Sequence, residues 1–264
     1  MNIPDLYLYH QISTSFKKIS LLTLFAGIFL FGYTGSTSAQ TIYVDQSATG
    51  NNDGSSWNDA YTTLQAALSN ASGSNEIWIA AGTYYPDEGA GQTEGDRTAT
   101  FTITGNQNGL EMYGGFAGTE SSRGSRNPDQ NPVILSGDID QDDNTFDPGT
   151  DSDSDTNTPS QTDHIVGGNS YSVMVLDGTT AGNITSSTVI DGVTITGGKA
   201  NASEGAMNET LRQNGAAIIM NGNGSGNECS PTLVDLEISG NYATSSGGAI
   251  YAYARNSGVS SPVL

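Results

Sequence analysis

The sequence predicts an all-β protein, a right-handed parallel β-helix (a solenoid of stacked coils) with an N-terminal α-helical cap. Three observations predict it: a composition of 34 glycines with only 14% charged residues, one convincing helix downstream of the N-terminal apolar run, and a repeat in the C-terminal third. Many glycines together with Ser, Thr, Asn and Asp are typical of short strands joined by many turns.

Residues 1–39 are predicted to be a signal peptide. Lys17 and Lys18 precede an apolar run of 13 residues (19–31), and a small-residue stretch ends in Thr37-Ser38-Ala39. The alternative is a membrane anchor, but spanning needs about 18–20 apolar residues. We expect cleavage after Ala39, export to the extracellular space or the outer-membrane surface, and no transmembrane segment after cleavage.

The remaining residues, 40–264, are expected to form one β-helix domain in three parts. These are the N-terminal cap and first coils (40–137), an acidic loop (138–163) and repeated coils (164–264). Residues 57–71 predict the capping helix, with Asn58 or Asp59 at its N-terminus and one apolar face. Apolar, β-rich runs predict the first strands at 41–45, 76–85, 99–104, 110–116, 132–137 and 171–178.

The C-terminal third contains three matched pairs of segments. VTITGG (193–198) matches LEISGN (236–241) at an offset of 43, and GAAI (215–218) matches GGAI (247–250) at an offset of 32. SPTL (230–233) matches SPVL (261–264) at an offset of 31, and an insert at 200–212 accounts for the larger value. A β-sandwich would also have short strands, but registered repeats favour a solenoid. The sequence ends inside the start of a coil, so we expect a solenoid that is incomplete at its C-terminus.

Stacking these repeats predicts where their side chains lie. Ile195 would lie on Ile238 and Ile218 on Ile250, forming aliphatic ladders inside the coils. The tight corners would be formed by glycines, because side chains do not fit there: Gly197, Gly240, Gly247 and Gly248.

At these residues the chain resembles secreted bacterial β-helix proteins of the pectin-lyase-like superfamily, especially those related to polymorphic outer membrane proteins. Those proteins repeat GGAI and FxxN tetrapeptides, which correspond here to residues 247–250 and, with Ile replacing Phe, to 238–241. The resemblance covers about 41–140 and 165–264 and also includes SSWNDAYTTLQAAL, EIWIAAGTYYP, MYGGFAGTE and ILSGDID. It implies an exported module, either adhesin-like or glycan-binding, or an enzyme that degrades polysaccharides.

The net charge and the sequence motifs help to distinguish a binding module from a polysaccharide-degrading enzyme. With 28 acidic and 8 basic residues the net charge is −20, which excludes nucleic acid as a partner because phosphates would be repelled. A polygalacturonase-like hydrolase would be expected to contain Gly-His-Gly and Arg-Ile-Lys segments, and the chain has neither. We therefore expect a binding or structural module that contacts a polysaccharide or a host or cell-surface glycan. A polysaccharide lyase or glycoside hydrolase is the alternative.

A pectate-lyase-like reaction would also need a basic residue beside a strand-borne acidic cluster. The basic residues after the signal peptide are few, and none is expected beside a repeated acidic strand: Arg97, Arg123, Arg126, Lys199, Arg212 and Arg255. Arg123 and Arg126 are expected to pair with surface carboxylates. No catalytic residue is assigned.

The acidic run after residue 137 is the candidate metal site. Asp138, Asp140 and Asp142 match positions 1, 3 and 5 of a calcium loop, but Asp143 replaces the glycine and Gly149 the closing glutamate. Asp147 is a substitute ligand in an irregular loop. Weak Ca²⁺ binding and a plain solvated loop both remain open.

The remaining candidate functional residues are aromatic residues that could bind sugars and a cysteine that could act as a nucleophile. Trp57, Trp78, Tyr84 and Tyr85 are candidates for stacking on sugars, although packing is the competing interpretation for both tryptophans. Cys229 is the only cysteine and the one histidine after the signal peptide is His164, so Cys229 is interpreted as a small core residue rather than a nucleophile.

Overall fold

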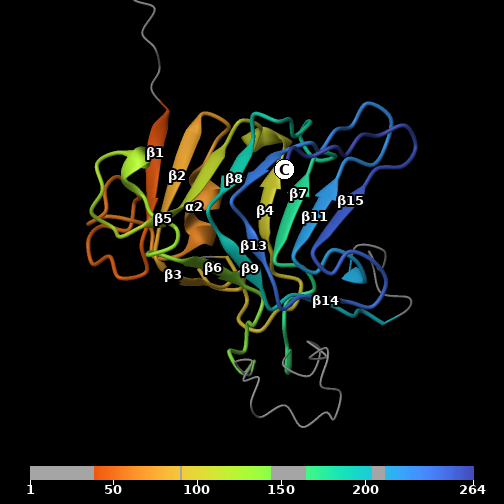
Figure 1. The fold of residues 1–264 in the computed structure, drawn as a ribbon, viewed down its shortest axis with the longest axis horizontal. Coiled ribbons are helices and arrows are strands. Elements are labelled where there is room, and N and C mark those ends of the chain that lie inside the picture. Colours follow the sequence, from red (N-terminus) through yellow and green to blue (C-terminus); the bar gives the residue numbers. More distant parts are fainter. Residues whose placement is uncertain (1–38, 90, 144–164, 204–211) are drawn as a thin grey trace, which may run out of the picture. The chain divides into compact units, whose positions relative to one another are not determined.

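A computed structural model describes residues 39–89, 91–143, 165–203 and 212–264 of the 264-residue chain. The described chain is mostly β, with parallel strands in sheets and one α-helix, which is consistent with a parallel solenoid-like fold (Figure 1). Within these ranges, no helix has the length and apolar character that a membrane span requires.

Most of the described strands belong to three parallel sheets. Sheet A contains β1 (Gln40–Val44), β2 (Asn75–Ala80), β5 (Glu111–Phe116), β8 (Val189–Asp191) and β12 (Thr232–Val234), in that order. Sheet B contains β3 (Gly82–Tyr84), β6 (Val133–Ser136), β9 (Thr194–Thr196) and β13 (Glu237–Ile238). Sheet C contains β4 (Phe101–Thr104), β7 (Met174–Asp177), β11 (Ile218–Asn221) and β15 (Ile250–Tyr253). The short strands β10 (Lys199–Ala200) and β14 (Tyr242–Ala243) pair with each other.

The chain visits the three sheets in the same order on each pass. Strands β2, β3 and β4 are followed by β5, β6 and β7, then by β8, β9 and β11, and finally by β12, β13 and β15. Each strand pairs in parallel with the equivalent strand of the next pass, so the short strands complete their hydrogen bonds between passes.

The pairing registers equal the offsets between the sequence repeats. Ile195 pairs with Ile238 and Ile218 with Ile250, while an isolated bridge joins Thr232 to Val263. These pairs are separated by 43, 32 and 31 residues, as the matched segments predict. The predicted ladders are therefore confirmed.

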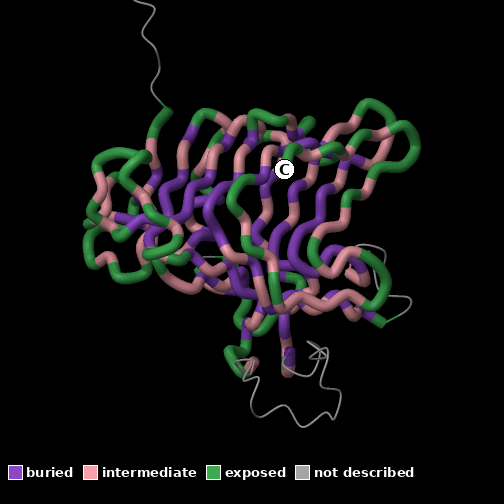
Figure 2. The backbone as a smooth tube through the Cα atoms, in the orientation of Figure 1, coloured by how far each residue is buried: buried purple, intermediate pink, exposed green. Residues whose placement is uncertain are grey.

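Apolar side chains from all three sheets meet in one core. Inward positions alternate with outward ones along β4, where Phe101 and Ile103 are fully buried while Thr102 and Thr104 are half-buried. Figure 2 shows buried residues along the strands and exposed residues in the turns at their ends. In sheet B, one inward row runs from Tyr84 through Leu135 and Ile195 to Ile238.

Glycines form corners between sheets, as predicted for three of the four positions. Gly197, Gly240 and Gly247 have φ angles of 71°, 60° and 66°, a left-handed conformation that strains other residues. Gly248 has no such angle. A side chain there would be too close to its neighbours, because a Cβ would lie 3.2 Å from the Asn241 carbonyl oxygen.

The α-helix, α2 (Leu64–Asn70), is shorter than the predicted 57–71. Asn58 and Asp59 do not cap it, which corrects the prediction: Thr63 is the N-cap residue, and the Asp59 carboxylate instead accepts the Asn51 N–H at 2.8 Å. Residues 57–63 do not extend the helix because Tyr61 bridges to Val44 beside β1. Two 3-10 helices, η1 (Gly105–Gln107) and η2 (Arg123–Ser125), lie in connections.

The buried face of α2 joins the core beside β4, the edge strand of sheet C. Leu64, Ala67 and Leu68 are buried, and Gln65 Nε2 donates to the Thr100 carbonyl at 3.1 Å. The helix thus covers part of a strand edge that no preceding strand covers, as expected for a cap.

The buried ladder predicts that substitutions at neighbouring positions of β9 have unequal effects on stability. Ile195→Ala removes a fully buried side chain and should cost about 2–5 kcal/mol of unfolding free energy, because a cavity remains. Thr194→Ala, at the adjacent half-buried position, should change it by about 0.5 kcal/mol or less. Urea unfolding measures both, and equal losses would contradict the assigned facing.

Candidate functional site

The acidic run brings three of its predicted metal ligands together. One carboxylate oxygen from each of Asp138, Asp140 and Asp142 lies within 4.8 Å of the others. Asp138 is half-buried and the other two are exposed. The predicted fourth ligand, Asp147, lies outside the described residues, as does His164.

Backbone N–H groups already satisfy much of this cluster. The Asp138 carboxylate accepts the N–H of Asp142 at 3.0 Å and of Asp143 at 3.3 Å. Asp140 accepts the Gly168 N–H at 2.7 Å, and Asp143 accepts the Val166 N–H at 2.7 Å. The last two bonds join residues 138–143 to residues 166–168, and we call these two segments, which flank residues 144–164, the neck.

The charges of the neck influence one another. Partial desolvation and the neighbouring Asp140 carboxylate raise the pKa of Asp142. Burial raises the pKa of Asp143 to about 6, although the Asn169 side-chain N–H bonded to its carboxylate at 2.8 Å acts in the opposite direction. The geometry therefore suits two roles, closure of a loop by hydrogen bonds and attraction of a cation to crowded carboxylates.

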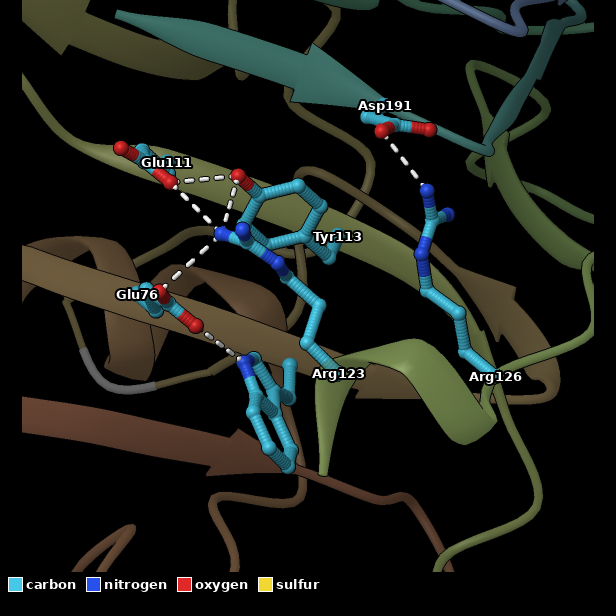
Figure 3. Close-up of polar contacts among 7 residues, drawn as sticks. Glu76, Glu111, Tyr113, Arg123, Arg126 and Asp191 are labelled. Carbon is cyan, nitrogen blue, oxygen red and sulfur yellow. Dashed lines mark hydrogen bonds and ion pairs between the residues drawn. The ribbon is translucent and has the colours of Figure 1, made fainter. Parts of the chain in front are cut away.

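A second polar cluster lies on the outer face of sheet A (Figure 3). Glu76 and Glu111 are register partners on β2 and β5, and Arg123 Nη1 lies 3.1 and 3.0 Å from their carboxylates. Arg123 Nη1 also donates to the Tyr113 hydroxyl at 2.7 Å, and that hydroxyl donates to Glu111. A basic residue thus does lie beside a repeated acidic strand, and the opposite expectation from the sequence is wrong.

This cluster fastens a loop rather than presenting free acid and base groups. Glu76 also accepts the Trp78 indole N–H at 2.7 Å, so both carboxylates are occupied. Burial, with the hydrogen bond to Glu111 second, raises the pKa of Tyr113, which keeps its hydroxyl protonated. The arginine is held by neighbours that a substrate would have to displace.

Arg126 forms the more buried ion pair. Its Nη2 lies 2.7 Å from Asp191 Oδ2, and the two side chains are only 17% and 11% exposed. Its Nη1 donates to the Gly114 carbonyl at 3.1 Å, so one guanidinium links the loop after β5 to β8 of the next pass. The expectation that Arg123 and Arg126 pair with surface carboxylates is confirmed for Arg123, whereas the carboxylate that pairs with Arg126 is buried.

Three of the four predicted stacking aromatics take part in packing. Trp78 is 6% exposed and lies parallel to Phe116 with ring centroids 4.7 Å apart, while Trp57 donates its indole N–H to the Glu120 carbonyl. Tyr84 is 2% exposed in the inward row of sheet B. Only Tyr85 is half-buried without a described ring contact. The packing interpretation is confirmed for both tryptophans, on the outer face of sheet A.

The structure instead exposes an aromatic pair that sequence reasoning missed. Tyr251 and Tyr253 are half-buried on β15, with ring centroids 5.8 Å apart and planes at 21°. They pair with Ile219 and Asn221, whose neighbour Met220 points into the core, so both tyrosines lie on the outer face of sheet C. The period-2 pattern YAY after GGAI was the signal that could have found them.

Cys229 has the properties of a core residue, as interpreted from the sequence. It is fully buried, and its thiol donates to the Leu176 carbonyl at a sulfur–oxygen distance of 3.3 Å. Burial raises the pKa of the thiol to about 12, so the nucleophilic thiolate does not form near neutral pH.

The described residues therefore define a mostly β protein with stacked parallel sheets, an acidic loop neck and an outward tyrosine pair. No protein-family model, curated protein or solved structure matches the chain.

The ion pairs of Arg126 and Arg123 are expected to contribute unequally to the unfolding free energy. Arg126→Gln leaves Asp191 buried without its partner and should cost about 3–5 kcal/mol of unfolding free energy. Arg123→Gln, at a side chain 46% exposed, should cost about 1 kcal/mol or less. Thermal unfolding of both variants checks this, and a larger loss for Arg123→Gln would refute the assignment.

Proposed function

We propose that the protein is an exported, right-handed parallel β-helix that binds glycans through its outer surface and has no catalytic role in this segment. Residues 1–39 are its signal peptide, and it acts outside the cell or at the outer-membrane surface. It belongs, in this proposal, with β-helix proteins of the pectin-lyase-like superfamily related to polymorphic outer membrane proteins.

The fold supports this proposal through the repeated order of the sheets. Successive passes through sheets A, B and C require connections between parallel strands, and such connections are right-handed in nearly all proteins. One residue of the tetrapeptide motifs also links neighbouring passes. Asn241 accepts the Gly198 N–H at 2.9 Å and donates to the Ile195 carbonyl at 2.8 Å, joining two corners.

The tyrosine pair on sheet C is the observation that carries the glycan-binding proposal. Tyr251 and Tyr253 present aromatic surface beside the polar side chains of Asn221 and Asp177, which continue the same row. Aromatic rings with hydrogen-bonding groups next to them suit sugars, which have apolar C–H faces and hydroxyl edges. The two tryptophans, in contrast, are occupied by packing.

Substitution of the pair tests the proposal directly. Replacing Tyr251 and Tyr253 by alanine should weaken glycan binding at least tenfold, since each lost stacking contact contributes about 1 kcal/mol. Tyr242→Ala, at a half-buried tyrosine on β14, is the matched control and should retain binding. A glycan array followed by affinity electrophoresis measures this, and equal binding by the double variant would refute the assigned face.

The alternative function, polysaccharide cleavage, is distinguished by product formation. Incubation with polygalacturonate and Ca²⁺ would yield unsaturated products that absorb ultraviolet light if the protein were a lyase. Release of reducing sugar would reveal a hydrolase. We expect neither, because the paired glutamates on sheet A are occupied by Arg123 and Trp78.

Weak Ca²⁺ binding at the neck is a second candidate function, favoured by the proximity of three carboxylates. Replacing Asp138, Asp140 and Asp142 by asparagine should abolish calorimetric heat at millimolar Ca²⁺, the range in which open extracellular sites bind. Asp235→Asn, Asp129→Asn and Asp53→Asn, combined in one protein, make a control with the same charge change. No heat from the unaltered protein would leave a loop closed by hydrogen bonds alone.

A further inference from the structure

A second feature of the outer face of sheet C is a cavity of about 180 Å³. Val175 and Ile219 contribute apolar surface to it, and Arg97, Tyr171 and Arg212 contribute the larger polar side chains. Ile219 is the register partner of Tyr251, so the cavity borders the tyrosine pair.

Two of the protein's few basic residues meet at this cavity. The guanidinium carbons of Arg97 and Arg212 lie 4.3 and 5.6 Å from the centroid of the Tyr171 ring. Within the described ranges neither forms an ion pair, whereas Arg123 and Arg126 both do. In a chain with a net charge of −20, two guanidinium groups that contact the same tyrosine ring and pair with no carboxylate of the described residues require an explanation.

Arg97 is held in place by neutral acceptors. Its Nε donates to the Asn169 carbonyl at 2.6 Å, and its Nη2 donates to the Lys199 carbonyl at 3.1 Å and to Asn201 Oδ1 at 2.6 Å. These bonds fix the guanidinium without neutralising it, and they leave Nη1 without an acceptor among the described residues. A cation that is already ordered loses little conformational freedom when an anion binds.

In the part of the chain that the structure describes, Asp96 is the carboxylate that interacts with Arg212, and it does not cancel the positive charge. The pKa of Asp96 is lowered chiefly by the Thr98 N–H, which lies 2.8 Å from its carboxylate, and only lastly by Arg212. Among the described residues, two guanidinium groups and one carboxylate leave a local excess of positive charge. At physiological ionic strength the more distant acidic residues are screened over about 8 Å.

We propose that this cavity is an oxyanion-binding site. Its ligand is the carboxylate of an acidic saccharide, whose ring would lie on Val175 and Ile219, or a free inorganic oxyanion of the same chemistry. Guanidinium groups bind carboxylate, sulfate and phosphate through charge-assisted, often bidentate hydrogen bonds. The saccharide form rests on the proposed glycan-binding function, whereas the inorganic form does not.

Matched ligands test the site in the whole protein. Calorimetric titration with methyl glucuronide, methyl glucoside and sodium sulfate separates the saccharide carboxylate from the sugar ring and from a free oxyanion. We expect the glucuronide to bind at least tenfold more tightly than the glucoside, and its affinity to fall with added NaCl.

Arg212→Gln is the decisive variant, because no described hydrogen bond of its side chain supports the fold, and Arg255→Gln is its control. Arg255 also lies over a tyrosine ring, at 5.5 Å from Tyr253, and its loss changes the net charge equally. Arg212→Gln should lose at least tenfold in affinity for the glucuronide, and Arg255→Gln should not. Arg97→Gln should show the same loss, with unfolding measured alongside because Arg97 also joins segments of the fold.

The outcomes separate this inference from the proposed function. Loss of glucuronide binding in Arg212→Gln supports the saccharide form, and loss of sulfate binding alone supports the inorganic form. Unchanged binding in Arg97→Gln and Arg212→Gln would overturn the proposed site. No binding of glucuronide or sulfate by the unaltered protein would overturn it as well. Glycan binding that depends on Tyr251 and Tyr253 would survive that result, so the two proposals fail independently.

Discussion

The pairing of each strand with its equivalent in the next pass is the constraint on which the rest of the structure depends. Strands here are two to six residues long, and β13 has only two, so none could be stable alone. Their backbone N–H and carbonyl groups form hydrogen bonds with the strand of the next pass. This pairing determines which residues are neighbours in successive passes. That register sets the ladders of the core, the glycines at the corners and the rows of side chains on each outer face.

Most acidic residues of the described ranges lie in the turns that connect these strands or at the ends of strands. Carboxylates accept N–H groups from their own turns, as Asp96 does from Thr98 and Asp177 from Thr179. The basic residues are too few to pair with them all, and two of the arginines link distant segments, Arg126 by an ion pair and Arg97 by hydrogen bonds to neutral acceptors. Arg126 joins residues 65 positions apart, and the Arg97 bonds span 72 to 104 positions. In the described residues, backbone N–H groups thus stabilise carboxylates of the turns, whereas arginines stabilise Glu76, Glu111 and Asp191.

The sequence was sufficient for the periodic parts of the structure and insufficient for the connections. The repeats predicted the pairings of Ile195 with Ile238 and of Ile218 with Ile250, because register follows directly from matched offsets. The start of α2 was misplaced because Tyr61 pairs with β1, a tertiary contact that outweighs local helix preference.

The candidate sites depended still more on connections. The loop after β5 returns Arg123 to Glu76 and Glu111, and no local pattern encodes that return. Tyr171 and Arg212 meet Arg97 only after three passes are stacked, so their residues are scattered in sequence. Tyr251 and Tyr253 could have been assigned to the outer face from alternation alone. Ile250 and Ala252, which alternate with them, pair with the inward residues Ile218 and Met220.

The neck of the acidic loop has a consequence for how such a chain can be altered. Asp140 and Asp143 bond to Gly168 and Val166, so the two ends of the loop are joined by contacts that do not involve the residues between them. Lengthening a loop whose ends are already held costs only about 0.6 kcal/mol for each doubling of its length. A foreign peptide inserted between residues 143 and 166 would therefore leave the bonds of the neck and the register of the neighbouring strands in place.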